Sequence, residues 1–318
     1  MPPGLTDRRV GAVVDLGSTS VHHLVAAIDA HSLEVLVDES AFLGLGAAAD
    51  ERGALGPAGR EELADTLAGF AWTARSHGAR NITFIGTEPL RRLADVARIV
   101  AEVDASTGVP VHVLRHEEEA LLTLLGVTGG APVERDLLVV DIGGGSSEFA
   151  YVGPKRLPEV AGLRIGAAAL ARRHGEGSPP TAETVAAMRR TATEALASAP
   201  PWNPVDIVLV GGTATNLAKV TDDETPRTRF SWADLDALDR LLAKTPGDEL
   251  AASYGVRPAR AALLPAGAAI VRAVSERFGA IEVLVLDSGI REGALIAVDR
   301  AGAGWRDRLA PLAHGWAG

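Results

Sequence analysis

Two short segments of the chain each place an aspartate, glycines and hydroxyl residues directly after an apolar strand. The first holds Asp15, Gly17, Ser18, Thr19 and Ser20, and the second holds Asp141, Gly143, Gly144, Gly145 and Ser146. Glycines let successive backbone N–H groups converge on one point, and such a concave nest binds anions, above all phosphate. Because the two segments share a pattern and lie a domain's length apart, we expect a duplicated fold with two phosphate-binding loops.

Four further segments carry residues whose side chains or backbone could take part in catalysis or phosphate binding. Arg91 and Arg92 follow a predicted strand, Glu117 to Glu119 begin a predicted helix, and Gly211-Gly212-Thr213 and Asp287 to Gly293 form further glycine-containing turns after apolar strands. An arginine can clamp phosphate oxygens through two parallel hydrogen bonds. A carboxylate can orient or deprotonate a water molecule. Acids at a helix start are also favoured by the helix dipole, so we expect Glu117 to be a solvated residue.

The composition is that of a globular protein with more than one core. The chain has 318 residues, of which 47% are hydrophobic and 23% charged, with no cysteine. This length suits two domains, and the lack of cysteine excludes disulfides and thiolate zinc sites. The formal net charge of −10 argues against a broad basic surface for duplex nucleic acid. No apolar run is long enough to span a membrane and no signal peptide is apparent, so we expect a cytoplasmic protein.

The elements that must position these residues are strands and helices in alternation. Val10 to Asp15, Val21 to Ile28 and Glu34 to Glu39 predict an antiparallel meander, and Leu43 to Gly59 predicts a glycine-rich loop. Leu90 to Thr107 predicts one continuous helix. Strands alternating with helices indicate the α/β class.

The second half of the chain repeats this organisation. Leu137 to Asp141 and Ser147 to Val152 predict a second meander, after a linker-like segment at 128–135. We therefore place a domain boundary between 130 and 131, with one domain over 1–130 and the other over 131–318. The tail at 302–318 is expected to pack back on a domain, in the first place the N-terminal one, or on a partner subunit.

At these motifs the chain resembles the Ppx/GppA family of exopolyphosphatases and guanosine-pentaphosphate phosphohydrolases, which belongs to the actin, Hsp70 and sugar-kinase superfamily. The matching segments run in family order, and they are Asp15 to Ser20, Gly86 to Arg91, Glu118 to Gly126, Asp141 to Glu148, Gly211 to Thr215 and Gly289 to Gly293. The resemblance implies two duplicated actin-like, ribonuclease H-like domains with a cleft between them. It also implies a short, two-domain member that lacks the extra helical domains of longer relatives.

The resemblance implies a role for each site residue. Glu119 is similar to the family's catalytic glutamate, with Glu118 and Arg91 as further catalytic candidates. The implied phosphate-binding residues are Gly17, Ser18, Thr19, Ser20, Gly143, Gly144, Gly145, Ser146, Gly211, Gly212 and Thr213. Asp15, Asp141 and Glu148 are oxygen ligands suited to Mg²⁺ or another divalent cation.

The sequence departs from the family pattern at a few positions. Thr19 replaces an asparagine, Phe42 replaces an arginine, and His116 replaces a glycine. Glu88-Pro89 is also an unusual pair before the arginine. These departures concern substrate preference and rate more than the type of reaction.

Three functions remain open from the sequence. The first is a hydrolase that releases terminal phosphate from inorganic polyphosphate or pppGpp by in-line attack of a water positioned by Glu119. The second is a sensor that binds polyphosphate or guanosine penta- or tetraphosphate without turnover. The third is an actin-fold kinase of a small molecule, against which the lack of an obvious acceptor-binding segment counts. Oligomeric state is open, and a homodimer is the usual expectation.

Overall fold

The computed structural model describes residues 8–29, 32–175, 178–220 and 228–315. Its internal contacts divide the chain into two compact units. Unit 1 comprises Met1–Gly130 together with Ile290–Ala313, and unit 2 is centred on Ala131–Gly289. Over the described part of the chain, no helix is both long and apolar enough to cross a bilayer.

Unit 1 is built on a five-stranded sheet in the order β3-β2-β1-β4-β5. Its strands are β1 (Arg9–Leu16), β2 (Val21–Ile28), β3 (Leu33–Ala41), β4 (Asn81–Gly86) and β5 (Val111–Val113). The first three pair antiparallel as a meander, and β4 and β5 add in parallel beside β1. The meander predicted from the sequence is confirmed.

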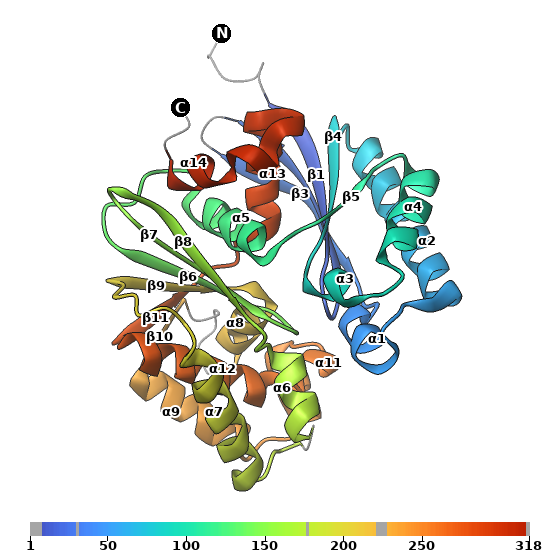
Figure 1. The fold of residues 1–318 in the computed structure, drawn as a ribbon. Helices are drawn as coiled ribbons and strands as arrows, with labels where there is room; N and C mark the ends of the chain where they lie inside the picture. The colour runs from blue at the N-terminus through green and yellow to red at the C-terminus, as the bar shows by residue number, and fades with distance from the viewer. Residues whose placement is uncertain (1–7, 30–31, 176–177, 221–227, 316–318) are drawn as a thin grey trace. The chain divides into compact units, whose positions relative to one another are not determined.

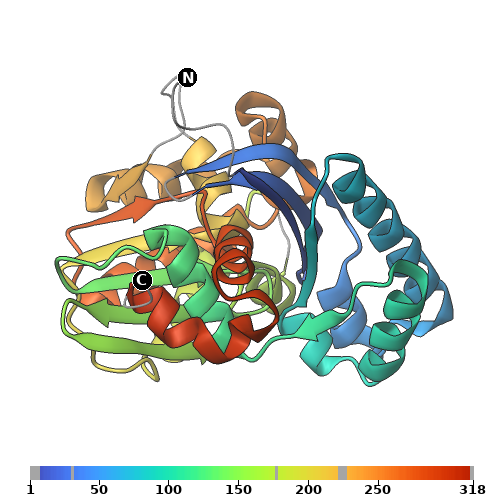
Figure 2. The same cartoon turned by 90° about the horizontal axis from the view of Figure 1, so that it is seen from above.

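Helices cover both faces of this sheet (Figure 1). They are α1 (Leu45–Arg52), α2 (Gly56–Ser76), α3 (Glu88–Arg92), α4 (Val96–Thr107), α5 (His116–Thr128) and α13 (Ile290–Ala301), followed by the 3₁₀ segment η1 (Gly302–Arg308) and α14 (Leu309–His314). Figure 2 shows α13 on the side of the strands opposite to α2 and α4. Val14 and Leu16 of β1 face the apolar core with Leu63 and Leu67 of α2. Because side chains alternate along a strand, Asp15 faces the side on which α13 lies.

Unit 2 repeats this plan around a six-stranded sheet in the order β10-β11-β9-β6-β7-β8. Its strands are β6 (Leu137–Ile142), β7 (Ser147–Gly153), β8 (Arg156–Leu163), β9 (Asp206–Val210), β10 (Arg229–Ser231) and β11 (Glu282–Val285). The meander β6-β7-β8 corresponds to β1-β2-β3, and β9 is parallel to β6 as β4 is to β1. The predicted α/β class with two duplicated actin-like units is confirmed; the cleft between them stays a prediction.

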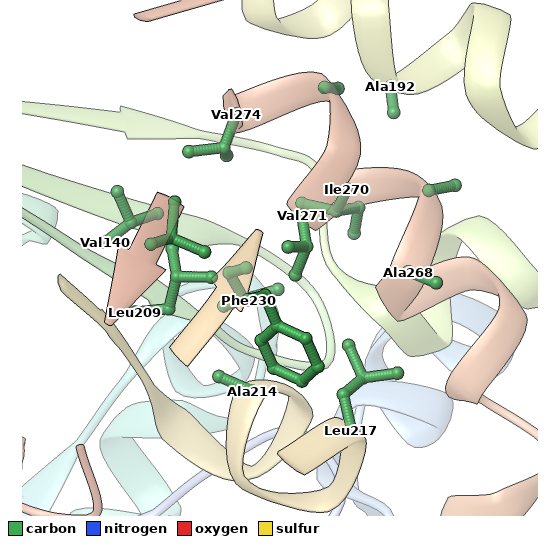
Figure 3. Close-up of a cluster of buried hydrophobic side chains, with 14 of the residues drawn as sticks. Val140, Ala192, Leu209, Ala214, Leu217, Phe230, Ala268, Ile270, Val271 and Val274 are labelled. Carbon is green, nitrogen blue, oxygen red and sulfur yellow. The ribbon is translucent and has the colours of Figure 1, made fainter. Parts of the chain in front are cut away.

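The core of unit 2 lies between its sheet and helix α12 (Leu264–Phe278). The other helices are α6 (Ala167–His174), α7 (Ala182–Leu196), α8 (Gly211–Lys219), α9 (Trp232–Leu242), α10 (Gly247–Tyr254) and α11 (Pro258–Ala261). Figure 3 shows Val140 and Leu209 of the sheet beside Ile270 and Val271 of α12, with Phe230 below them. Small and branched residues fill this core because the chain has few aromatics: 4% of its residues.

Among the differences between the structure and the sequence predictions, three concern residues 43–59, residues 90–107 and strand β8. The glycine-rich loop predicted over 43–59 contains helix α1, and the continuous helix predicted over 90–107 is split into α3 and α4. The split occurs because Leu93 is extended, while the Asp95 carboxylate accepts hydrogen bonds from the backbone N–H groups of Leu55 and Gly56 at 3.0 and 3.1 Å. The third difference is strand β8, which the sequence did not predict.

The assignment of residues from 290 onward to the second domain also differs from the structure. The boundary near residue 130 coincides with the division of the chain, but Ile290–Ala313 groups with unit 1 rather than with the second domain. The reason is helix α13, which packs along α5 so closely that a Cβ on Gly293 would collide with the carbonyl of Leu122. Of the tail at 302–318, residues 316–318 lie outside the described part of the chain.

Candidate phosphate-binding and catalytic site

The two glycine loops share one backbone hydrogen bond at equivalent positions. In unit 1 the N–H of Gly17 donates to the carbonyl of Ser20 at 3.2 Å, and in unit 2 the N–H of Gly143 donates to the carbonyl of Ser146 at 3.0 Å. Each loop joins the first two strands of its meander, β1 to β2 and β6 to β7. The resemblance between the two sequence motifs therefore corresponds to a repeated tight turn.

A helix begins directly against each loop. The N–H of Gly46 in α1 donates to the carbonyl of Ser18 at 2.8 Å, and the N–H of Ala167 in α6 donates to the carbonyl of Gly143 at 3.0 Å. A side chain on Gly46 would collide with Ser18, and one on Gly166 would collide with Gly144. These helix starts fix loop carbonyls, while the N–H groups of Gly17 and Gly143 are used within their own turns. Phosphate binding by the N–H groups of the other loop residues stays a prediction.

Arg91 and Glu119 form the central contact of unit 1. Arg91, in α3 directly after β4, donates through Nη1 to Oε1 of Glu119 and to the carbonyl of Leu114 at 2.6 Å. Glu119 is buried in the first turn of α5, whereas the Arg91 side chain is 27% exposed. The structure thus brings these two predicted residues together, with a cation held beside a desolvated carboxylate.

Glu118 faces a different arginine. Arg306 of η1 donates from Nε to Oε1 of Glu118 at 2.8 Å and from Nη2 to Oε2 at 2.7 Å. The N–H of Arg115 donates to the same Oε2 at 2.8 Å, closing the start of α5. Burial would raise the pKa of Glu118, but these hydrogen bonds outweigh burial and lower the pKa below its usual range. Glu118 is therefore an ionised residue that holds the helix start.

Glu88 lies against the first glycine loop. The Oγ of Ser18 donates to Oε2 of Glu88 at 3.4 Å, and Nη2 of Arg92 donates to that oxygen at 3.2 Å. Arg92 also pairs with Asp50 of α1. Arg92 thus binds acids of its own unit, and Glu88, one of the departures from the family pattern, places a buried carboxylate beside a predicted phosphate ligand.

Asp15 and Asp141 occupy equivalent strand ends but have different neighbours. Across the antiparallel strand pairs, Asp15 lies opposite His22 and Asp141 lies opposite Glu148. Residues directly opposite one another on paired strands share a face, with Cβ atoms about 5 Å apart. Unit 2 therefore carries two neighbouring carboxylates where unit 1 carries a carboxylate and an imidazole.

The third glycine turn abuts this carboxylate pair. Gly211, at the start of α8, has φ +85°, and a Cβ there would collide with Oδ1 of Asp141. The side chain of Thr213 points instead into the core, where it lies against Gly267 of α12. The turn therefore places the backbone of Gly211 next to Asp141, and the phosphate-binding role of Thr213, whose Cγ2 methyl meets Gly267, stays a prediction.

Sequence reasoning missed two arginines. Arg260 of α11 lies next to Gly212, and burial, helped by the charge of Arg257, lowers its pKa. Arg291 at the start of α13 pairs with Asp38 of β3 at 2.6 Å, and the neighbouring charges of Glu292, Asp38 and Asp15 counter burial and raise its pKa. Arg291 stood inside a recognised motif, whereas nothing in the local sequence marks Arg260.

Asp141 and Glu148 supply some of the oxygen ligands that a magnesium ion needs. Asp141 and Glu148 supply two carboxylates on one face, and Mg²⁺ usually takes one or two carboxylates and keeps several waters. The described residues contain no group of three or more His, Asp or Glu that could hold a metal. A site made of Asp141, Glu148, water and substrate oxygens fits this arrangement, and the roles of Asp15, Asp141 and Glu148 stay predictions.

Proteins of known name and known structure are similar to this chain over most of its length. Exopolyphosphatase 1 of Mycobacterium tuberculosis is 29% identical over 301 residues, which cover 89% of this chain and 86% of that protein. The guanosine-5'-triphosphate,3'-diphosphate pyrophosphatase of Vibrio cholerae is 29% identical over 293 residues, 89% of this chain and 58% of that protein. The crystal structure of the Aquifex aeolicus Ppx/GppA family member has a TM-score of 0.81 and 25% identity, covering 92% of this chain and 97% of that one.

Duplicated actin-like units, each with a glycine loop at the end of its first strand, define the class as an actin-like α/β protein. The model of the Ppx/GppA phosphatase family matches residues 24–299. The chain belongs to the Ppx/GppA phosphatase family. The resemblance stated from the sequence is confirmed, and the names of the relatives bear out the predicted enzyme class, hydrolases that act on phosphoanhydrides.

Proposed function

We propose that this protein hydrolyses a terminal phosphoanhydride bond, releasing phosphate from inorganic polyphosphate or pppGpp. The contact between Arg91 and Glu119 carries the proposal, because it sets a buried carboxylate beside a phosphate-binding cation. Family membership and the names of the relatives support the same reaction. A cytoplasmic location, a homodimer and a cofactor remain predictions.

In the proposed reaction the chain's groups bind, orient and accept a proton. The Glu119 carboxylate accepts a hydrogen bond from a water and aims it at the terminal phosphorus, opposite the bridging oxygen. As the new P–O bond forms, the water proton passes to Glu119 or to solvent. The bridging P–O bond breaks, and the shortened substrate leaves with the bridging oxygen and its electron pair. General-base assistance of this kind contributes about 10²–10⁴ in rate.

The remaining groups bind the charge of the phosphates. Backbone N–H groups at Gly17 to Ser20 and at Gly143 to Ser146 provide dipoles, with the hydroxyls of Ser18 and Ser146 as further donors. Arg91, partly exposed, is free on its outer side to reach phosphate oxygens while Nη1 stays on Glu119. A divalent cation at Asp141 and Glu148 would neutralise charge on the phosphate chain.

The decisive measurement is phosphate release from tripolyphosphate, long-chain polyphosphate and pppGpp in the presence of Mg²⁺. We expect Glu119→Gln, which keeps the shape of the side chain, to lower kcat by about 10²-fold or more. Glu117→Gln is the matched control, since Glu117 lies two residues earlier, pairs with His116 and has a side chain that is 44% exposed. Equal rates for wild type and Glu119→Gln would overturn the role of Glu119.

The same preparation separates the alternatives. Tight binding of polyphosphate or guanosine penta- or tetraphosphate with no released phosphate would favour a sensor. Formation of ADP from ATP only when a sugar or carboxylic acid acceptor is added would favour a kinase. Either result would replace the proposed hydrolase, whereas the relative rates on the three substrates identify the preferred one.

A further inference from the structure

We infer that Arg306, in the C-terminal segment, is a positioning residue for Glu119, and this inference rests on the proposed function. Arg306 donates hydrogen bonds to Glu118 and to the backbone carbonyl of Val113. Its effect on catalysis would pass through the start of helix α5. The segment that carries it is far along the chain and lies outside the family motifs.

Adjacent glutamates on one helix point in different directions. Successive residues of an α-helix are turned by about 100°, so Glu118 and Glu119 face different neighbours. Each has its own arginine: Glu119 binds Arg91 and Glu118 binds Arg306. The direction of Glu119 is therefore tied to the direction of Glu118 through one shared turn of helix.

The two arginines also fix the backbone that enters α5. Arg91 donates to the carbonyl of Leu114 at 2.6 Å, and Arg306 donates to the carbonyl of Val113 at 3.3 Å. The N–H of Arg115 then donates to Oε2 of Glu118 at 2.8 Å. Three successive residues are thus held before the helix begins, which leaves the first turn little freedom to rotate.

Arg306 itself extends from an anchored backbone. Its neighbour Trp305 is 2% exposed and meets the ring of His112 on β5 edge to face, with 5.7 Å between ring centroids. Both nitrogens of the Arg306 fork bind Glu118, a geometry that a lysine cannot reproduce. Because the backbone beside Arg306 is anchored by Trp305 and its guanidinium group binds Glu118 through two nitrogens, Arg306 is preorganised to hold the start of α5.

Removing Arg306 would leave a buried carboxylate without its main counter-charge. The charged and titratable neighbours that remain are Arg115, His112 and Asp307 around Glu118 and Arg306, and Arg91 beside Glu119. Arg115 is 74% exposed and lies 3.5 Å from Glu118, so it cannot replace a desolvated fork. The uncompensated charge of Glu118 would favour protonation of Glu118 itself and of the adjacent Glu119.

The test compares Arg306→Ala with Arg300→Ala as a matched control. Arg300 also comes from the C-terminal segment and also holds α5, but at the opposite end, where it donates to the carbonyl of Gly129 at 2.8 Å. We expect Arg306→Ala to lower kcat by about 10-fold to 10²-fold, to change KM less than about twofold and to move the acid limb of the pH–rate profile upward. Arg300→Ala should keep all three within about twofold, and Arg306→Lys should be intermediate.

A second pair of measurements keeps the inference falsifiable if Arg306→Ala folds poorly. The double variant Arg306→Ala/Glu118→Gln removes the unpaired charge, so the acid limb should return towards that of wild type. Hydrogen exchange of the peptide at 111–120 should accelerate in Arg306→Ala and not in Arg300→Ala, whether or not phosphate is released. If the wild-type protein released no phosphate, that result would contradict the proposed function. A folded Arg306→Ala with the wild-type kcat, pH profile and exchange would remove this inference alone.

Discussion

The Oε2 atom of Glu88 lies 3.4 Å from the Oγ atom of Ser18, so a carboxylate shares the first glycine loop with the site predicted for phosphate. Arg92 binds that carboxylate but also pairs with Asp50, so the cluster of Glu88, Arg92 and Asp50 carries one excess negative charge. This charge opposes the approach of a phosphate to the Ser18 side of the loop. We therefore expect Glu88 to weaken substrate binding if phosphate binds at Ser18 as proposed.

We expect Glu88→Gln to lower KM for a polyphosphate or pppGpp substrate by about fivefold. Two unit charges about 4 Å apart interact by about 1 kcal/mol in a water-like dielectric, which corresponds to that factor. Steady-state kinetics at low and high salt measure the effect, which should shrink as salt screens it. Glu61→Gln, an exposed neutralisation in α2, controls for net charge. A KM that rises in Glu88→Gln would show that the carboxylate assists binding.

The carboxylate pair in unit 2 predicts a stability effect of magnesium. Asp141 and Glu148 lie directly opposite each other on β6 and β7, and a divalent cation bound by both, as proposed, would offset the repulsion between the two carboxylates. Added Mg²⁺ at ten times its Kd would stabilise the folded protein by about 1.4 kcal/mol. We expect Glu148→Gln to abolish this Mg²⁺-dependent rise in Tm, while Glu194→Gln, an exposed change on α7, retains it. An undiminished rise in Glu148→Gln would place the ion elsewhere.

Much of this fold follows from short-range sequence patterns. The two meanders and the glycine turns after β1 and β6 depend on alternation and on turn residues, which a single sequence displays. The helix within 43–59 was not predicted because glycines dominate that segment; Gly46 is required there by contact with Ser18. Gly46 therefore stands in helix α1 because of tertiary packing and not because of helix propensity.

The parts of the site that were missed depend on residues far apart in the chain. Arg306 and Glu118 are separated by 188 positions, and Arg260 meets Gly212 through the packing of α11 beside α8. No local pattern encodes such a pairing. The sequence could therefore predict which glutamates stand at the start of α5, but not that each of them would have an arginine of its own.

His23 predicts a pH dependence of stability. The ring is fully buried in β2, stacks on Phe70 with 4.8 Å between centroids and binds Glu39 through Nδ1 at 2.9 Å. Burial lowers its pKa below the ordinary 6.5 and outweighs the opposing effect of Glu39. In the unfolded chain the imidazole takes up a proton near pH 6.5, which the folded protein resists, so stability is lost as the pH falls below that value.

We expect the wild-type Tm to fall between pH 6.5 and the lower pKa of folded His23, and His23→Phe to lose that part of the slope. Phenylalanine keeps the stacking on Phe70 but cannot titrate. His116→Gln is the control, because His116 is 47% exposed and its removal should leave the slope unchanged. Parallel Tm curves for wild type and His23→Phe would show that another group is responsible.

Gly211 is the position at which the third glycine turn is most constrained. Its φ of +85° disfavours any L side chain, at a cost of about 1–2 kcal/mol, and a Cβ there would also press on the carboxylate of Asp141. Gly212 next to it has neither constraint, since the nearest atom to its Cβ position is 3.6 Å away on Arg260.

We therefore expect Gly211→Ala to lower the free energy of unfolding by about 2 kcal/mol or more and to weaken Mg²⁺ binding by displacing Asp141. Gly212→Ala should change the free energy of unfolding by less than about 1 kcal/mol. Denaturant titration of both variants with and without Mg²⁺ measures this, and equal destabilisation by the two substitutions would contradict the strain assigned to Gly211.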